Sequence, residues 1–73
     1  MPSELQLVFG QRVRAERERK GLSQVKLAHL LDIHQSDLCD IEKGRHAPTL
    51  ETVEKIAAKL DVPATALLSP SPV

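Results

Sequence analysis

The stretch that decides the fold runs from Ser23 to Gly44 and has the sequence SQVKLAHLLDIHQSDLCDIEKG. Ser23 is a favourable helix N-cap, and the apolar residues after it predict one buried helix side. These residues are Val25, Leu27, Ala28, Leu30 and Leu31. Asp32 tolerates the left-handed backbone of a tight corner better than most residues. The first part of the stretch therefore predicts a short helix that ends in a turn.

A second short helix is predicted at about 35–43, with Leu38 and Ile41 directed toward the core. Gly44 is suited to end it, because glycine adopts the left-handed conformation that closes many helices. The two helices and the turn form the pattern of a DNA-binding helix-turn-helix, in which the second helix enters the major groove.

Helices are also predicted on both sides of this pair. Leu5, Phe9 and Val13 recur every four residues and predict an apolar stripe on a helix at about 4–20, which Gly21 ends. Thr49 is suited to cap a helix whose buried face is formed by Leu50, Val53, Ile56, Ala57 and Leu60. A corner at 61–63 then leads to a last short helix with Leu67 and Leu68. No segment alternates like a strand, so we predict an all-α, compact five-helix domain at 1–68 and a disordered tail at 69–73.

The composition limits the class of protein. The chain has 73 residues, with Phe9 as its only aromatic residue and Cys39 as its only cysteine. One thiol cannot form an internal disulfide, which fits a reducing compartment. Neither a membrane-spanning segment nor a secretory signal is predicted. We therefore expect a soluble, intracellular protein in the cytoplasm, whose small core makes oligomerisation reasonable.

The net charge is zero, but the charge is unevenly distributed. Between Arg12 and Lys26 there are six basic residues and two acidic ones, a local charge of +4. This run is interpreted equally well as a solvated helix surface or as part of a surface that attracts DNA.

The outward face of the predicted 35–43 helix carries the chemistry for DNA recognition. Glutamine pairs with adenine and serine bonds to several bases, so Gln35 and Ser36 are predicted to contact base edges. Cys39, Asp40 and Lys43 lie on the same face. Asp37 suits the positive end of the helix dipole, whereas Asp40 either accepts from a cytosine amino group or repels DNA in general.

Other side chains are predicted to contact phosphates or to support the helix. Gln24 lies at a helix N-terminus, a favourable place for an anion, and Lys43 and Arg45 are candidates for phosphate contacts. For Arg45 an ordinary loop surface is an equally good interpretation. Arg17 continues the apolar stripe of the first helix, and a charge there needs a buried partner. We predict an ion pair between Arg17 and Glu42.

The ordered set of motifs resembles the Cro and phage lambda repressor type of helix-turn-helix, the XRE family. The matching pieces are Phe9-Gly10, Val13, Arg17, Gly21-Leu22-Ser23-Gln24, Leu27-Ala28, Ile41-Glu42-Lys43-Gly44, Pro48-Thr49-Leu50, Ile56-Ala57, Leu60 and Leu67-Leu68. The resemblance implies a five-helix domain that binds operator DNA, usually as a symmetric dimer. It also implies that Gln24, Gln35, Ser36 and Asp40 face DNA, with Lys43 and Arg45 near phosphates.

The chain departs from the family pattern at four positions. Asp32 and Asp61 stand where the family usually has turn glycines, which predicts slightly strained corners. His34 replaces the usual Ser or Thr N-cap, which weakens the cap and puts an imidazole near the backbone. Glu16 stands where many members have leucine.

We therefore expect a dimeric transcriptional repressor or regulator that acts on a palindromic operator. The alternatives are an antitoxin-type protein, or a protein-interaction module of the same fold, with another protein as main partner. An enzyme, a cofactor and a metal site are not expected, because His29, His34 and His46 lie on different segments and no glycine-rich phosphate loop occurs. The expected dimer surface is the corner between the last two helices, with Val62, Ala64, Leu67 and Leu68.

Overall fold

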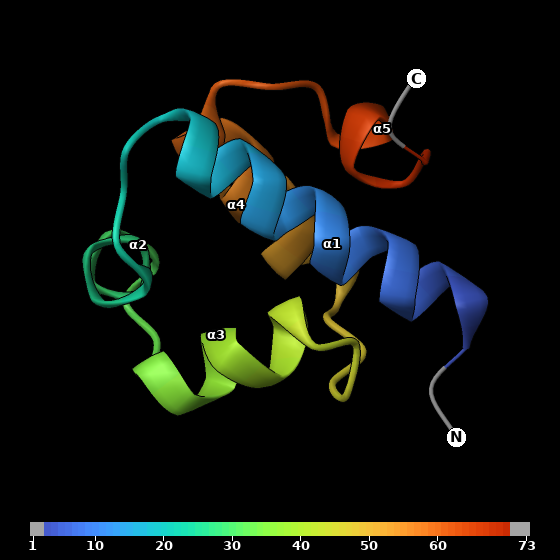
Figure 1. Ribbon diagram of the computed structural model, residues 1–73, viewed down its shortest axis with the longest axis horizontal. Helices are drawn as coiled ribbons and strands as arrows, with labels where there is room; N and C mark the ends of the chain where they lie inside the picture. The colour runs from blue at the N-terminus through green and yellow to red at the C-terminus, as the bar shows by residue number, and fades with distance from the viewer. Residues whose placement is uncertain (1–2, 71–73) are drawn as a thin grey trace.

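The computed structural model describes residues 3–70, and within that range it consists of five helices without strands (Figure 1). The helices are α1 (Glu4–Arg19), α2 (Gln24–Leu31), α3 (Gln35–Glu42), α4 (Leu50–Leu60) and α5 (Ala64–Leu67). The predicted all-α, five-helix class is confirmed. None of the helices in this range is long and apolar enough to cross a bilayer. Of the tail predicted to be disordered, 71–73 lie outside the described residues, whereas the Ser69 hydroxyl donates to the Thr65 carbonyl.

Side-chain caps begin three of the helices. The Ser23 hydroxyl accepts from the Lys26 N–H at 3.0 Å, and the Thr49 hydroxyl accepts from the Thr52 N–H at 3.2 Å, as predicted. Ser3 forms a capping box with Gln6 at the start of α1. His34 makes no side-chain cap bond to α3, which confirms the weakened cap expected there. The start of α3 is thus held by packing more than by its own cap.

Both corners predicted to be strained adopt the left-handed conformation. Asp32 ends α2 and Asp61 ends α4, each with φ of 57°. Aspartate is among the few non-glycine residues that occupy this region with some regularity. These two helices therefore stop without the glycine that is usual at such ends.

The core lies between α1 and the other helices (Figure 1). Helix α1 contacts α3, α4 and α5, and α2 contacts α3 and α4. The buried apolar side chains are Phe9, Val13, Leu27, Ala28, Leu31, Leu38, Ile41, Val53, Ile56, Ala57, Leu60 and Leu67. Two side chains of the helix-turn-helix stretch, Leu38 and Ile41, lie among them, so α3 is anchored to the core as predicted.

Four apolar residues predicted to be buried are exposed instead. Leu5 and Leu50 lie in the first turns of α1 and α4, and 55% and 78% of their surfaces are exposed. Val25 and Leu30 are also exposed, because the buried side of the short helix α2 is formed by Leu27, Ala28 and Leu31. The predictions were wrong because periodicity identifies a helix face but not how far the neighbouring helices extend along it.

The expected dimer surface also needs correction. Leu67 is completely buried in the core, and Val62 and Ala64 pack against the core with partial exposure. Only Leu68 among the four keeps a large exposed side chain. A last helix of four residues needs its leucine for attachment to the domain, so Leu67 is not available to a partner.

Two glycines allow close contacts between α1 and the end of α3. A Cβ added at Gly10 would lie 2.4 Å from the Ile41 carbonyl oxygen and 2.6 Å from that of Glu42. A Cβ at Gly44 would lie 2.7 Å from a methyl carbon of Leu7, and Gly44 also has a positive φ of 75°. The C-terminal end of α3 is therefore pressed directly against the backbone of α1.

Replacement Gly10→Ala should destabilise the fold by about 3 kcal/mol, because the obstructing atoms are backbone carbonyls that cannot move aside separately. In an unobstructed helix the same change stabilises by about 0.5–1 kcal/mol, so the sign alone is informative. Gly21→Ala is the control: nothing lies within 4 Å of its added Cβ, and only the left-handed backbone costs about 1 kcal/mol. Urea unfolding of both variants tests the prediction, and equal or greater stability of Gly10→Ala would contradict it.

Candidate nucleic-acid interface

The exposed side of α3 begins with polar residues. His34, Gln35 and Ser36 are exposed, whereas Leu38 and Ile41 on the opposite side are buried. Farther along, Cys39 and Asp40 are half-buried, and Lys43 and Arg45 are exposed. All eight residues predicted to face DNA therefore keep at least part of their surface accessible, the eighth being the half-buried Gln24 at the start of α2.

The structure brings some of these residues together around one hollow. The hollow has a volume of about 340 Å³ and lies between α1, α2 and α3. Its lining consists of Arg14, Arg17, Gln24, Cys39, Glu42 and Lys43. His34, Gln35, Ser36, Asp40 and Arg45 are not part of this lining. The hollow therefore brings together Gln24, Cys39 and Lys43, and the other five predicted residues lie outside it.

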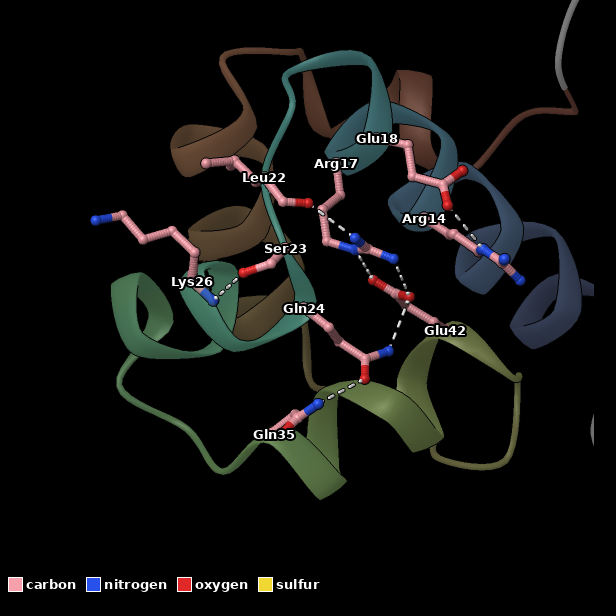
Figure 2. A network of polar contacts seen from close by, with 9 residues as sticks. All are labelled: Arg14, Arg17, Glu18, Leu22, Ser23, Gln24, Lys26, Gln35 and Glu42. Atoms are coloured by element: carbon pink, nitrogen blue, oxygen red, sulfur yellow. Dashed lines mark hydrogen bonds and ion pairs between the residues drawn. The ribbon is translucent and has the colours of Figure 1, made fainter.

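The predicted ion pair between α1 and α3 is present and buried. Arg17 Nε donates to Glu42 Oε2 at 2.7 Å, and Arg17 Nη2 donates to Glu42 Oε1 at 3.1 Å (Figure 2). Arg17 Nη1 also donates to the Leu22 carbonyl oxygen at 2.8 Å. This two-bond arrangement suits the planar guanidinium, and it joins α1, the α1–α2 loop and α3.

The hydrogen bonds to Glu42 raise the pKa of Arg17 above its ordinary value, although burial by itself would lower it. Because the folded-state pKa is the higher one, the resulting stabilisation is complete below the ordinary arginine pKa. It is lost only as the pH rises through the raised value, far above neutrality. The arginine thus remains charged under all ordinary conditions.

The Gln24 side chain, predicted only to contact a phosphate, forms hydrogen bonds with two other side chains. Its Nε2 donates to Glu42 Oε1 at 3.1 Å, and its Oε1 accepts from Gln35 Nε2 at 3.3 Å (Figure 2). The first residue of α2 is therefore linked both to the buried ion pair and to the first residue of α3. Sequence reasoning predicted the pair of Arg17 with Glu42, but it did not connect Gln24 to Glu42 or to Gln35.

A second buried carboxylate was missed in the sequence. Glu16 is only 7% exposed and pairs with Arg12 at 3.2 Å and with Arg19 at 2.9 Å. Arg12 Nε also donates to the Ala66 carbonyl oxygen, which ties α1 to α5. The available signal was position, since Glu16 and Arg17 follow Val13 by three and four residues and continue its buried face.

These contacts show which arginines of the basic run are paired with carboxylates. Arg12 and Arg17 belong to the packing of α1, and Arg14 forms an exposed pair with Glu18 at 3.3 Å. Four of the six basic residues of the run are therefore paired with carboxylates, whereas Lys20 and Lys26 are exposed. The exposed cations directly after α3 are Lys43 and Arg45, and the acid Asp37 is exposed in the first turn of α3.

The comparisons with known proteins agree with this arrangement. Residues 13–67 match the helix-turn-helix family model. The chain is 37% identical over 62 residues to the immunity repressor protein of Bacillus phage phi105, covering 85% of this chain and 43% of that protein. It is 40% identical over 63 residues to the control protein C.BamHI of Bacillus amyloliquefaciens, covering 85% of this chain and 78% of that protein.

A solved structure is similar over almost its full length. The crystal structure of SinR, the master regulator for biofilm formation, in complex with DNA superimposes with a TM-score of 0.78 and 35% sequence identity. The similarity covers 84% of this chain and 98% of that one. The chain therefore belongs to the helix-turn-helix family, of the XRE type that its sequence resembles. It spans less than half the length of the phi105 repressor that it matches.

Loss of the buried carboxylate in Glu42→Ala should destabilise the fold by about 3–5 kcal/mol, because Arg17 is left buried without its partner. The matched control is Glu18→Ala, which removes one partner of an exposed arginine–glutamate pair and should cost no more than about 0.5 kcal/mol. Thermal unfolding of the two variants measures the difference. Similar melting temperatures for the two would contradict a structural role of the buried pair.

Proposed function

We propose that the protein binds double-stranded DNA sequence-specifically and acts as a transcriptional regulator, most simply as a repressor at a palindromic operator. The observation that carries the proposal is the two-sided character of α3. Its buried side is anchored by Leu38 and Ile41, while Gln35 and Ser36 are exposed at its start. A helix held in this way presents its N-terminal side chains to a major groove.

The relatives support this proposal. One of the matched proteins is named a repressor, another is named a control protein, and the structure of SinR contains DNA. Regulation of transcription by DNA binding requires no catalytic step. We also propose that this activity takes place in the cytoplasm, because a chain with a single cysteine suits a reducing compartment.

The exposed side chains divide into two kinds of contact. Base edges are assigned to Gln35 and Ser36, with Cys39 and Asp40 one turn farther along α3. Phosphates are assigned to Gln24, His34, Lys43 and Arg45, which lie at helix ends or beside the hollow. Asp37 and Asp40 oppose a polyanion, so we expect weak nonspecific binding and a comparatively high dependence on sequence.

Selection of bound sequences from random duplex DNA at two salt concentrations tests the proposal. We expect a palindromic motif whose affinity falls steeply with salt. Gln35→Ala should lower affinity by about 1–3 kcal/mol and relax preference at one base position, whereas Lys43→Ala should weaken all sequences alike and reduce the salt slope by about 1. Absence of enrichment at low salt would reject DNA binding.

A protein partner is the alternative function. It is favoured by the zero net charge and by the two acids on α3, which are unusual for a surface that approaches phosphates. In that case the same domain serves an antitoxin-type or interaction role. The DNA selection distinguishes the interaction module, which would yield no motif, whereas an antitoxin-type protein would still bind DNA for autoregulation.

We also propose that the protein acts as a homodimer, with Leu68 in the contact surface. Leu68, Leu5 and Leu50 are exposed around a largely apolar hollow of about 300 Å³, formed by α1, the loop before α4, α4 and the end of α5. Exposed leucines gathered in one place favour association. A symmetric dimer also matches a palindromic site with half-sites about 34–36 Å apart.

Leu68→Glu should convert the dimer to a monomer, because an isologous surface places the new charge twice in one contact. Val25→Glu is the control, since Val25 is an exposed apolar residue on α2, outside this hollow. Sedimentation equilibrium measures the molecular mass of each variant. A wild-type protein that stays monomeric would contradict the proposed dimer. A Leu68→Glu variant that remains dimeric would show that the contact surface does not include Leu68.

A further inference from the structure

Four side chains from three helices form one continuous chain of hydrogen bonds (Figure 2). It begins at Arg17 on α1, passes through Glu42 on α3 and Gln24 on α2, and ends at Gln35 on α3. The first two members are buried, Gln24 is half-buried and Gln35 is exposed. The chain thus connects the interior of the domain with the side chain assigned to a base.

The buried carboxylate of Glu42 fixes which group donates and which accepts in each of these hydrogen bonds. An ionised carboxylate only accepts hydrogen bonds, so Glu42 requires the NH₂ group of Gln24 to face it. The amide oxygen of Gln24 then points the other way, and Gln35 must donate to it. The two ends of each amide group are therefore assigned by chemistry, because the reversed arrangement would place an amide oxygen against the carboxylate.

The direction of the hydrogen bonds determines which donor and acceptor groups of Gln35 remain available to a base. A primary amide carries two N–H donors and an oxygen acceptor, and one N–H is already bonded to Gln24. One donor and the acceptor remain, which is the pattern complementary to the N7 acceptor and N6 amino donor of adenine. In the reversed chain both N–H groups would remain, which suits the two acceptors N7 and O6 of guanine.

We propose that Glu42 is a specificity-determining positioning residue, which orients Gln24 and through it Gln35 so that the domain prefers adenine over guanine at the base facing Gln35. This inference rests on the proposed DNA binding and adds to it a residue that itself touches no base. The second N–H of Gln24 stays free for the phosphate contact assigned to it above.

Glu42→Gln tests the direction while preserving shape. The new amide can keep only one of the two bonds from Arg17, because its NH₂ group cannot accept a hydrogen bond. When its oxygen keeps the shorter bond, from Arg17 Nε at 2.7 Å, its NH₂ group replaces Oε1, gives up the Nη2 bond at 3.1 Å and faces Gln24. Gln24 must then turn its oxygen inward and its NH₂ group toward Gln35, so the chain reverses. We expect the adenine-to-guanine affinity ratio at the base facing Gln35 to fall by about tenfold or more.

The measurement is the binding of duplexes that differ only at that base, which is first located with Gln35→Ala. Glu18→Gln is the matched control, because it makes the same change in an exposed arginine–glutamate pair and should leave the ratio unaltered. Gln24→Ala leaves the buried ion pair intact and should also collapse the ratio. If Glu42→Gln fails to fold, an unchanged ratio in Gln24→Ala still contradicts the proposal, because Glu42 acts on Gln35 through Gln24.

The outcomes separate the two proposals. If the wild-type protein binds no DNA, both fail. If it binds a motif but prefers another base than adenine opposite Gln35, the inference fails and DNA binding stands. The same holds if folded Glu42→Gln and Gln24→Ala proteins keep the wild-type ratio, because a purely structural Glu42 would change affinity for every sequence alike.

Discussion

The buried contact between Arg17 and Glu42 is the interaction on which the arrangement of the helices depends. It joins α1 to the last residue of α3, and the Nη1 bond to the Leu22 carbonyl fixes the loop that leads into α2. The approach that makes the short bond possible requires Gly10, since a side chain there would push the two helices apart. The ion pair, the bond to the Leu22 carbonyl and the close helix contact at Gly10 thus all join α1 to the helix-turn-helix, and apolar packing holds the remaining helices.

The ion pairs of α1 bear on the proposed approach of this domain, whose net charge is zero, to DNA. Several arginines of α1 are used in pairs with Glu16, Glu18 and Glu42 and strengthen the domain instead of its outer field. Exposed cations remain next to the end of α3, at Lys43 and Arg45. Attraction to phosphates then comes from particular side chains near α3, with little contribution from overall charge.

Much of the fold was predictable because its signals are local. The caps at Ser23 and Thr49, the left-handed turn at Asp32 and the end of α3 at Gly44 depend on nearest neighbours along the chain. The Arg17–Glu42 pair was predictable as well, since a charge in an apolar stripe demands a partner.

The remaining features depend on contacts that no local pattern specifies. The exposure of Leu50 depends on where neighbouring helices end, and the burial of Leu67 depends on how α5 docks against the domain. The connection of Gln24 to Gln35 depends on the angle at which α2 meets α3. Which side chains face DNA is assigned from α3 as a whole and stays a prediction at each position.

The close contact between Gly44 and Leu7 bears on the thermodynamics of complex formation. The end of α3 is held against α1, and the Gln6 amide donates to the Gly44 carbonyl at 3.4 Å. A helix held in this way loses little backbone freedom when a ligand binds, so only a few exposed side chains remain to be ordered. The conformational entropy that the backbone of α3 loses on association is accordingly small, and discrimination between partners depends on the side chains at the start of the helix.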